Sequence, residues 1–225
     1  MDDSPATDLD ALVRRVDPDR WMSSRFVADP ALRADVVALY AFDHELARAP
    51  KVASNPLIGE IRLTWWREAL DEVYEGRAVR RHPTAEALAD MVHRRGLERA
   101  RLETLIDARY RELDARPMDE KDALAWAGDT GGVAAEIAAG LLAPGSEAGP
   151  ARAAGTAWAL ARRAAHAPAL KPVAERALSA ARTAVKELSP RAFPAAAHAT
   201  LVGRGAKSEL ARRLKVTFAV ARGRI

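Results

Sequence analysis

The chain has 225 residues, of which 49% are hydrophobic and 29% charged, and it contains no cysteine. This length and hydrophobic content suffice for a single domain with a sizeable core. The absence of cysteine excludes disulfides, thiolate metal sites and cysteine nucleophiles.

The sequence also indicates where in the cell we expect the protein. Residues 1–10 are acidic and polar, whereas a secretory signal begins with basic residues and an apolar run. No later segment is an apolar run long enough to span a bilayer. We therefore expect a cytoplasmic protein, either soluble or peripheral to the inner face of a membrane.

The charge is distributed unevenly along the chain. Residues 152–225 contain 15 Lys and Arg but 3 Asp and Glu, a balance of +12, while residues 1–151 contain the remaining 20 and 28, a balance of −8. The basic part is either a solvated face of alanine-rich helices or a surface for an anionic membrane or an acidic protein partner. Nucleic acid is the least favoured partner, because aromatic residues do not alternate with the basic ones there.

Almost every segment of the chain has the periodicity of a helix. The predicted helices, in chain order, cover residues 38–49, 57–75, 84–95, 98–114, 119–142, 151–166, 172–188 and 207–221. No segment alternates polar and β-branched residues as a strand would. We predict an all-α bundle formed by one domain, residues 19–225, after an N-terminal polar segment, residues 1–18.

The usual catalytic motifs are missing from this helical pattern. The five histidines are scattered, and none forms the i, i+4 pair with an intervening acid that a helical zinc site uses. The glycines Gly131, Gly132 and Gly140 stand inside a helical run, where they favour close helix packing or a cavity wall over a phosphate loop.

Five segments in a fixed order carry a family resemblance. They are "RWMSSRF" (20–26), "ALYAF" (38–42), "LTWWREAL" (63–70), "LIDARYREL" (105–113) and "DTGGVAAEIAAGLL" (129–142). In this order and spacing they resemble the squalene/phytoene synthase family of head-to-head prenyl transferases. The resemblance implies an isoprenoid synthase-like helical bundle around a central cavity, shortened here at the C-terminal end.

Members of that family join two prenyl diphosphates and use two aspartate-rich helices to hold Mg²⁺. The metal neutralises the leaving diphosphate, and acids four residues apart on one helix face can ligate it. Aligned with the first of these helices, the aspartate positions of the family fall on Ala47, Arg48 and Lys51. The nearby acids Asp43 and Glu45 are two residues apart, so they point to different faces and do not rebuild the site.

The second aspartate-rich helix is degenerate as well. Its expected acids fall on His166, Ala169 and Leu170, and a further departure places Tyr110 and Glu112 where the family usually has Arg and Asp. We therefore predict no catalytic residue, no metal site and no cofactor. Mg²⁺ would be needed only if the chain were an active prenyl transferase.

Three hypotheses for the function follow. The first is a non-catalytic family member, a pseudoenzyme that binds a lipid or isoprenoid or assists the assembly of a respiratory complex, as a divergent subgroup with a mitochondrial complex I assembly factor does. The second is a prenyl transferase of isoprenoid biosynthesis with altered ligands, in which Arg48 and Lys51 contact the diphosphate directly. The third is a structural interaction module without a small ligand.

Two sets of residues are candidates for contacts with partners. The aromatic residues Tyr40, Phe42, Trp65 and Trp126 either line an apolar pocket for a lipid chain or simply fill the core. The basic residues Lys207, Arg212, Arg213 and Lys215 share a helical stretch with apolar ones, a pattern typical of helices that lie on anionic membranes or dock on acidic partners.

Overall fold

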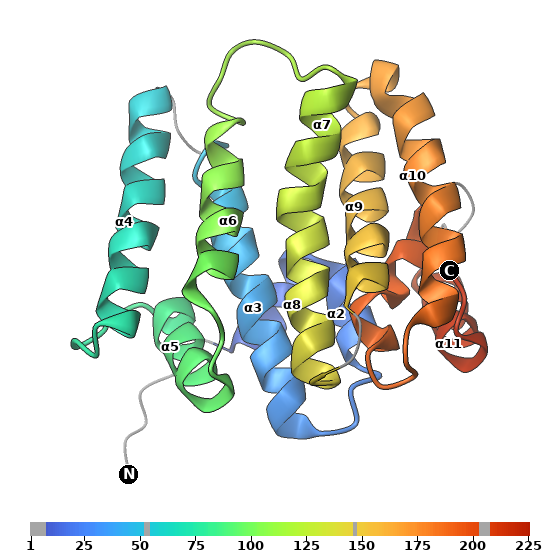
Figure 1. Ribbon diagram of the computed structural model, residues 1–225, viewed down its shortest axis with the longest axis horizontal. Coiled ribbons are helices and arrows are strands. Elements are labelled where there is room, and N and C mark those ends of the chain that lie inside the picture. Colours follow the sequence, from blue (N-terminus) through green and yellow to red (C-terminus); the bar gives the residue numbers. More distant parts are fainter. Residues whose placement is uncertain (1–7, 52–54, 146–147, 203–207) are drawn as a thin grey trace.

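A computed structural model of the chain describes residues 8–51, 55–145, 148–202 and 208–225. Every regular element in these ranges is a helix, which confirms the all-α prediction (Figure 1). None of the described helices is both long and apolar enough to cross a membrane.

Most helices run side by side across the molecule, with α4 at one end and α10 and α11 at the other (Figure 1). The α-helices are α1 (Leu9–Val16), α2 (Pro18–Ser24), α3 (Pro30–Arg48), α4 (Pro56–Tyr74), α5 (Pro83–Arg95), α6 (Arg99–Tyr110), α7 (Glu120–Ala127), α8 (Val133–Leu142), α9 (Gly149–Ala164), α10 (Lys171–Ala184) and α11 (Glu209–Arg222). Five shorter elements are the π-helix η1 (Gly128–Gly132) and the 3₁₀ helices η2 (Pro168–Leu170), η3 (Val185–Glu187), η4 (Phe193–Ala195) and η5 (Ala197–Leu201).

The first helix lies within the segment that we expected to be a polar extension. Asp8 caps α1 by accepting a hydrogen bond from the amide of Ala11, and Asp17 caps α2 in the same way. The side chain of Val13 is fully buried, and α1 packs on α3. The packed part of the chain therefore begins ahead of residue 19.

Helix α3 is the centre of the bundle. It contacts α1, α2, α5, α6 and α8, and its run from Asp35 to Asp43 is buried throughout. A helix that is buried all round has apolar residues on every face, and this explains why its periodicity is weak. Asp35 is the polar exception near its start, and Arg94 and Arg95 at the end of α5 pair with it at 2.6 and 2.7 Å.

The stretch that we predicted as one helix, residues 119–142, forms a continuous rod of α7, η1 and α8 (Figure 1). Its middle is a π-helical turn that packs directly on α9. A Cβ added at Gly131 would lie 2.6 Å from the carbonyl oxygen of Gly155, so only glycine permits this approach. Gly132 faces Arg152 and Thr156 equally closely, whereas no atom of the described residues lies within 4 Å of such a Cβ at Gly140. The close packing expected of the first two glycines is confirmed.

Candidate functional site

A cavity of about 400 Å³ opens between α3, α6, η1 and α9. Its walls come from the N-terminal turn of α2, the second half of α3, the end of α6 and the end of α9. The lining residues are Val16, Asp17, Arg20, Asp43, His44, Ala47, Lys51, Arg109, Glu112, Trp126, Thr130, Gly131, Trp158, Ala159, Arg162, Arg163 and His166. Charged side chains are therefore a large part of its surface.

Five of these side chains form a row of buried ion pairs. Arg20 donates to Asp17 at 2.5 Å and to Asp43 at 2.8 Å. Arg109 donates to the other oxygen of Asp43 at 2.6 Å and to Glu112 at 2.8 Å. All five are almost inaccessible to solvent. Since an isolated charge is very costly in such a place, the charge of each member has to be compensated by its neighbours.

Asp43 is the centre of this row. Burial alone would raise the pKa of Asp43, but Arg109 and Arg20 outweigh that effect, so its pKa lies well below the usual range. The carboxylate is therefore ionised at neutral pH, and both of its oxygens already accept hydrogen bonds from arginine.

Aromatic rings enclose the arginines. The guanidinium of Arg20 lies 4.8 Å from the ring centres of both Tyr40 and Trp158, and Trp126 donates its indole N–H to Glu112 at 3.1 Å. Burial also raises the pKa of Tyr40, whose hydroxyl has no hydrogen-bond partner among the described residues. The rings therefore hold the guanidinium planes in a fixed orientation, while the carboxylates compensate the charges.

The residues of the first degenerate motif, Ala47, Arg48 and Lys51, lie partly in the cavity and partly on the surface. Ala47, in the last turn of α3, and Lys51, just after the helix ends, line the cavity. Arg48 points outward instead and pairs with Glu45 at 3.0 Å, as their spacing on an exposed helix face allows. Arg48 is therefore not one of the residues that line the cavity, where the second hypothesis places its contact with the diphosphate.

The second degenerate motif contributes one residue. His166 lines the cavity, whereas Ala169 is exposed and Leu170 is buried in η2 away from it. The end of α9 instead brings Arg162 and Arg163 to the cavity.

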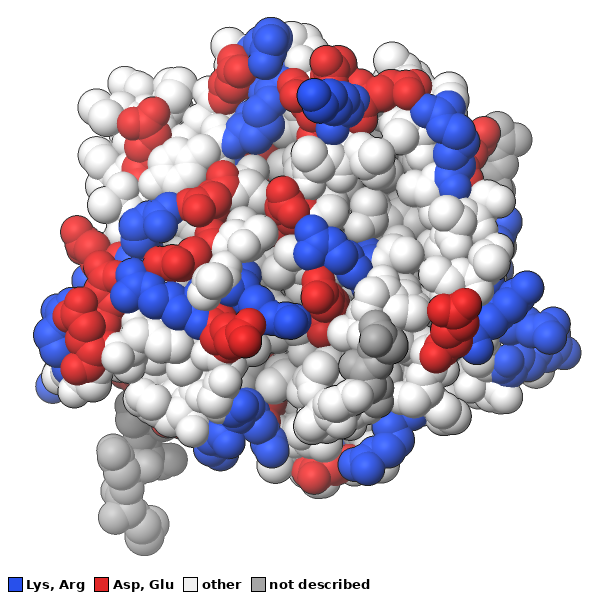
Figure 2. Space-filling model, in the orientation of Figure 1, with Lys and Arg blue, Asp and Glu red and all other residues white. Residues whose placement is uncertain are grey.

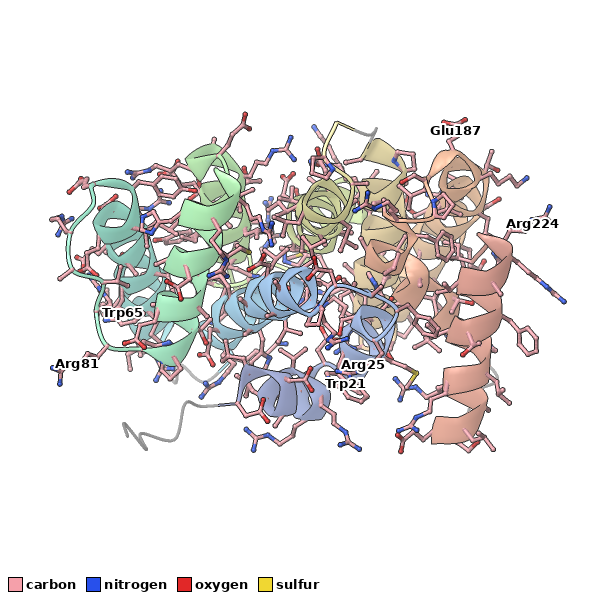
Figure 3. The ribbon with its side chains drawn as sticks, turned by 90° about the horizontal axis from the view of Figure 1, so that it is seen from below. Trp21, Arg25, Trp65, Arg81, Glu187 and Arg224 are labelled. Carbon is pink, nitrogen blue, oxygen red and sulfur yellow. The ribbon has the colours of Figure 1, made fainter. Side chains whose placement is uncertain are left out.

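The candidate aromatic residues lie in three different places. Trp126 lines the cavity, and Tyr40 stands behind Arg20 in its wall. Phe42 is fully buried against Trp66, at 5.3 Å between ring centres, because it faces α4 and not α9. Trp65 borders a separate groove beside α4, far to the left in Figure 3. Phe42 and Trp65 therefore lie outside the cavity wall.

The arginines of the cavity were missed from the sequence. Arg20 and Arg109 are inside the segments "RWMSSRF" and "LIDARYREL" that carry the family resemblance, which was the available signal. The pair of Asp17 with Arg20 is local, three residues apart at the start of α2, and was overlooked. Asp43 was not recognisable as a partner, because it meets Arg20 and Arg109 only where α3 packs against α2 and α6.

The residues do not fit a magnesium site. Within the described ranges no three His, Asp or Glu side chains are grouped so that they could hold a metal ion. Asp17, Asp43 and Glu112 are each bound by an arginine, and Lys51 lines the same space. A divalent cation would have to displace the guanidinium groups from carboxylates that they bind at short range.

The basic C-terminal residues that we predicted to form one partner surface lie in different surroundings. Arg212 pairs with Asp19 at the inner side of α11, and Arg213 pairs with Glu209 along the helix. Lys215 borders a separate pocket beside α11, and Lys207 lies outside the described residues.

Comparisons with known proteins place these features in a family. The family model "Squalene/phytoene synthase" matches residues 13–171, more than half of the chain. The fold matches a crystal structure of a dehydrosqualene synthase in complex with ligand, with a TM-score of 0.71, 14% identity and coverage of 95% of this chain and 94% of that one. At this identity the likeness establishes the fold.

Two curated relatives are assembly factors. The chain is 30% identical over 103 residues, 46% of its length, to NADH dehydrogenase (ubiquinone) complex I, assembly factor 6 of Bos taurus. It is 24% identical over 110 residues, 49% of its length, to the homologue in Dictyostelium discoideum. The matched segment spans 30% of the length of each relative. From its family-model match and its fold, the chain belongs to the squalene/phytoene synthase family.

Proposed function

We propose that the chain is a non-catalytic member of its family, a pseudoenzyme that acts as an assembly factor for a respiratory NADH dehydrogenase complex at a membrane surface. The observation that carries this proposal is the row of buried ion pairs. Positions that would face a metal–diphosphate complex hold Ala47, Lys51 and His166, and the carboxylates that remain are bound to Arg20 and Arg109. The two curated relatives named above support the assembly role.

The proposal makes the cavity a rigid part of the bundle with no role in bond making. Ionisation of an allylic diphosphate needs a strong electrophile at the leaving oxygens, and arginines already neutralised by Asp17, Asp43 and Glu112 are poor substitutes. An apolar prenyl chain is also poorly suited to a wall with five buried charges, because it would offer them no hydrogen bonds.

A diphosphate-binding enzyme is the second candidate. Lys51 and Arg163 line the cavity, and among the described residues neither has an acidic side chain within ion-pair distance, which favours binding of an anion there. Binding alone does not supply catalysis, so we rank this candidate below the first. Isothermal titration with inorganic pyrophosphate, and separately with farnesol, tests the charged and the apolar part of such a ligand.

Removal of the gene tests the assembly role. We expect a loss of assembled NADH dehydrogenase complex on native gels and of NADH–quinone activity in membranes, both restored by the wild-type gene. The matching biochemical test incubates the purified protein with farnesyl diphosphate and Mg²⁺. Product formation that EDTA abolishes would overturn the non-catalytic assignment, and a normal level of the complex without the gene would overturn the assembly role.

A further inference from the structure

Helix α11 has an apolar outer face. Leu210, Leu214 and Phe218 are spaced four residues apart, and their exposed fractions are 68%, 49% and 55%. The opposite face, with Val216 and Ala219, is buried against the bundle, where α11 contacts η5 and α2. One face of α11 thus holds the helix on the protein, while the outer stripe of Leu210, Leu214 and Phe218 remains exposed.

A basic pocket borders this apolar stripe. It has a volume of about 410 Å³ and is lined by Thr200, Lys215, Phe218, Ala219, Arg222 and Arg224. Phe218 belongs both to the stripe and to the pocket, and the guanidinium of Arg222 lies 5.6 Å from the centre of its ring. Arg224 points away from the bundle in Figure 3.

The three cations of the pocket are unlike most arginines of this protein. In the part of the chain that the structure describes, no carboxylate lies within ion-pair distance of Lys215, Arg222 or Arg224. Over α4 to α6, by contrast, basic and acidic side chains alternate, while basic side chains gather at the right-hand edge of Figure 2, on the side where Figure 1 places α11. The pocket therefore has uncompensated positive charge next to exposed apolar surface.

A second exposed apolar face lacks that combination. Leu57, Ile58 and Ile61 are exposed on α4, at the opposite end of the molecule (Figures 1 and 3). The groove beside them is lined by one acidic and one basic residue, Glu45 and Arg62, with Trp65, Trp66 and His82. Hydrophobic exposure alone thus does not distinguish α11, but its charge does.

We propose that α11 docks on an anionic membrane surface, with Leu210, Leu214 and Phe218 entering the boundary between headgroups and acyl chains and Lys215, Arg222 and Arg224 holding a lipid phosphate. A helix with an apolar stripe and cations beside it suits this interface, since the lipid supplies apolar and negative groups side by side. This inference deepens the proposed location at a membrane surface, and it changes the basic residues concerned. Arg212 and Arg213, expected to be part of this face, are engaged by Asp19 and Glu209.

Vesicle co-sedimentation tests the charges. The wild-type protein should sediment with phosphatidylcholine–phosphatidylglycerol vesicles, less so in high salt, and remain in solution with pure phosphatidylcholine. The triple variant Lys215→Gln, Arg222→Gln, Arg224→Gln should lose about a hundredfold in partitioning, since each cation contributes about fivefold. The control Arg77→Gln, Arg116→Gln, Arg176→Gln removes the same charge elsewhere and should retain most binding.

A second pair of variants tests the apolar stripe. Leu214→Ser with Phe218→Ser should weaken binding, whereas Leu57→Ser with Ile61→Ser, equally exposed on α4, should not. Circular dichroism confirms that every variant is folded. Equal binding to neutral vesicles, or equal binding by the α11 variants and their controls, overturns the proposal.

Other occupants of the stripe give different results. A dimer in sedimentation velocity that Phe218→Ser dissociates, without vesicle binding, would assign the face to a second copy and overturn the proposal. The experiments also separate this inference from the assembly role. A wild-type protein that fails to bind vesicles yet restores the NADH dehydrogenase complex contradicts the docking alone, while vesicle binding without restoration contradicts the assembly role alone.

Discussion

The cations of this protein occupy two regions that differ in how their charge is balanced. Around the cavity, Arg20 and Arg109 are buried, and each binds two carboxylates. At α11, Lys215 and Arg222 border a pocket with no carboxylate at ion-pair distance in the described ranges. A buried charge must be compensated by an opposite charge of the same protein, whereas a surface charge can be compensated by a charge on a binding partner. The first region is therefore structural and the second is available for a partner.

The strongest test of the buried region is to remove its central carboxylate. Asp43→Ala leaves Arg20 and Arg109 without the group that they share, and we expect the free energy of unfolding to fall by about 3–5 kcal/mol. Urea denaturation measures the loss. The control Arg176→Ala breaks the exposed pair with Glu120 and should cost at most about 1 kcal/mol. Equal losses in the two variants would contradict the structural role of the row.

The buried His198 beside the same region predicts how the stability of the protein depends on pH. It is fully buried against Trp158, neither ring nitrogen has a hydrogen-bond partner among the described residues, and burial together with Arg20 lowers its pKa to about 3. Between the unfolded pKa of about 6.5 and this value the unfolded chain binds a proton that the folded one does not. Stability should therefore fall with decreasing pH, by up to about 1.4 kcal/mol per unit.

Replacement of the imidazole should remove that dependence. The free energy of unfolding of His198→Leu, measured by urea denaturation, should fall less between about pH 6.5 and 4.5 than that of the wild type, by about 2–3 kcal/mol across the window. The wild-type slope persisting in the variant would show that another group titrates there.

A smaller effect is expected when the guanidinium of Arg20 is replaced by a cation of a different shape. Arg20→Lys retains a cation, but an ammonium cannot stack between Tyr40 and Trp158 while it reaches both Asp17 and Asp43. We expect a loss of about 1.5 kcal/mol, the contribution of one charge-assisted hydrogen bond. Thermal unfolding measures it, with the exposed Arg25→Lys as a neutral control. No difference between the two would mean that charge alone stabilises the row.

The helices could be predicted because their periodicity is local. The prediction for residues 84–95 matches α5 (Pro83–Arg95) almost to the residue, since proline and glycine mark its ends. The helices α1 and α2 were missed because they are short and polar outside, and their caps Asp8 and Asp17 lie in a segment that reads as an extension. The π-helical turn in residues 128–132 was not predicted from periodicity, and its close contact with Gly155 of α9 joins residues that are distant in the sequence.

The sequence indicated some residues of the cavity wall, Lys51 and Trp126 among them, but not the ion pairs that occupy it. The replacement of acids at Ala47 and Lys51 is visible from the order of motifs, and both residues line the cavity. What fills the site instead depends on pairs far apart in the chain, such as Arg109 with Asp43. The direction in which a side chain points was also not predictable from the order of motifs. Arg48 is next to Ala47 in sequence, but the helix turns it outward to Glu45.

The smallest expected effect concerns the α11 region. In the absence of lipid, the triple variant Lys215→Gln, Arg222→Gln, Arg224→Gln should unfold within about 0.5 kcal/mol of the wild type, because surface substitutions that break no pair have little effect. Removal of three neighbouring like charges should, if anything, raise the melting temperature slightly at low salt, and this gain should vanish at high salt. A loss above about 1 kcal/mol would show that the cations are matched inside the protein. In that case a loss of vesicle binding by this variant would report on its fold, so thermal unfolding decides how the binding result is interpreted.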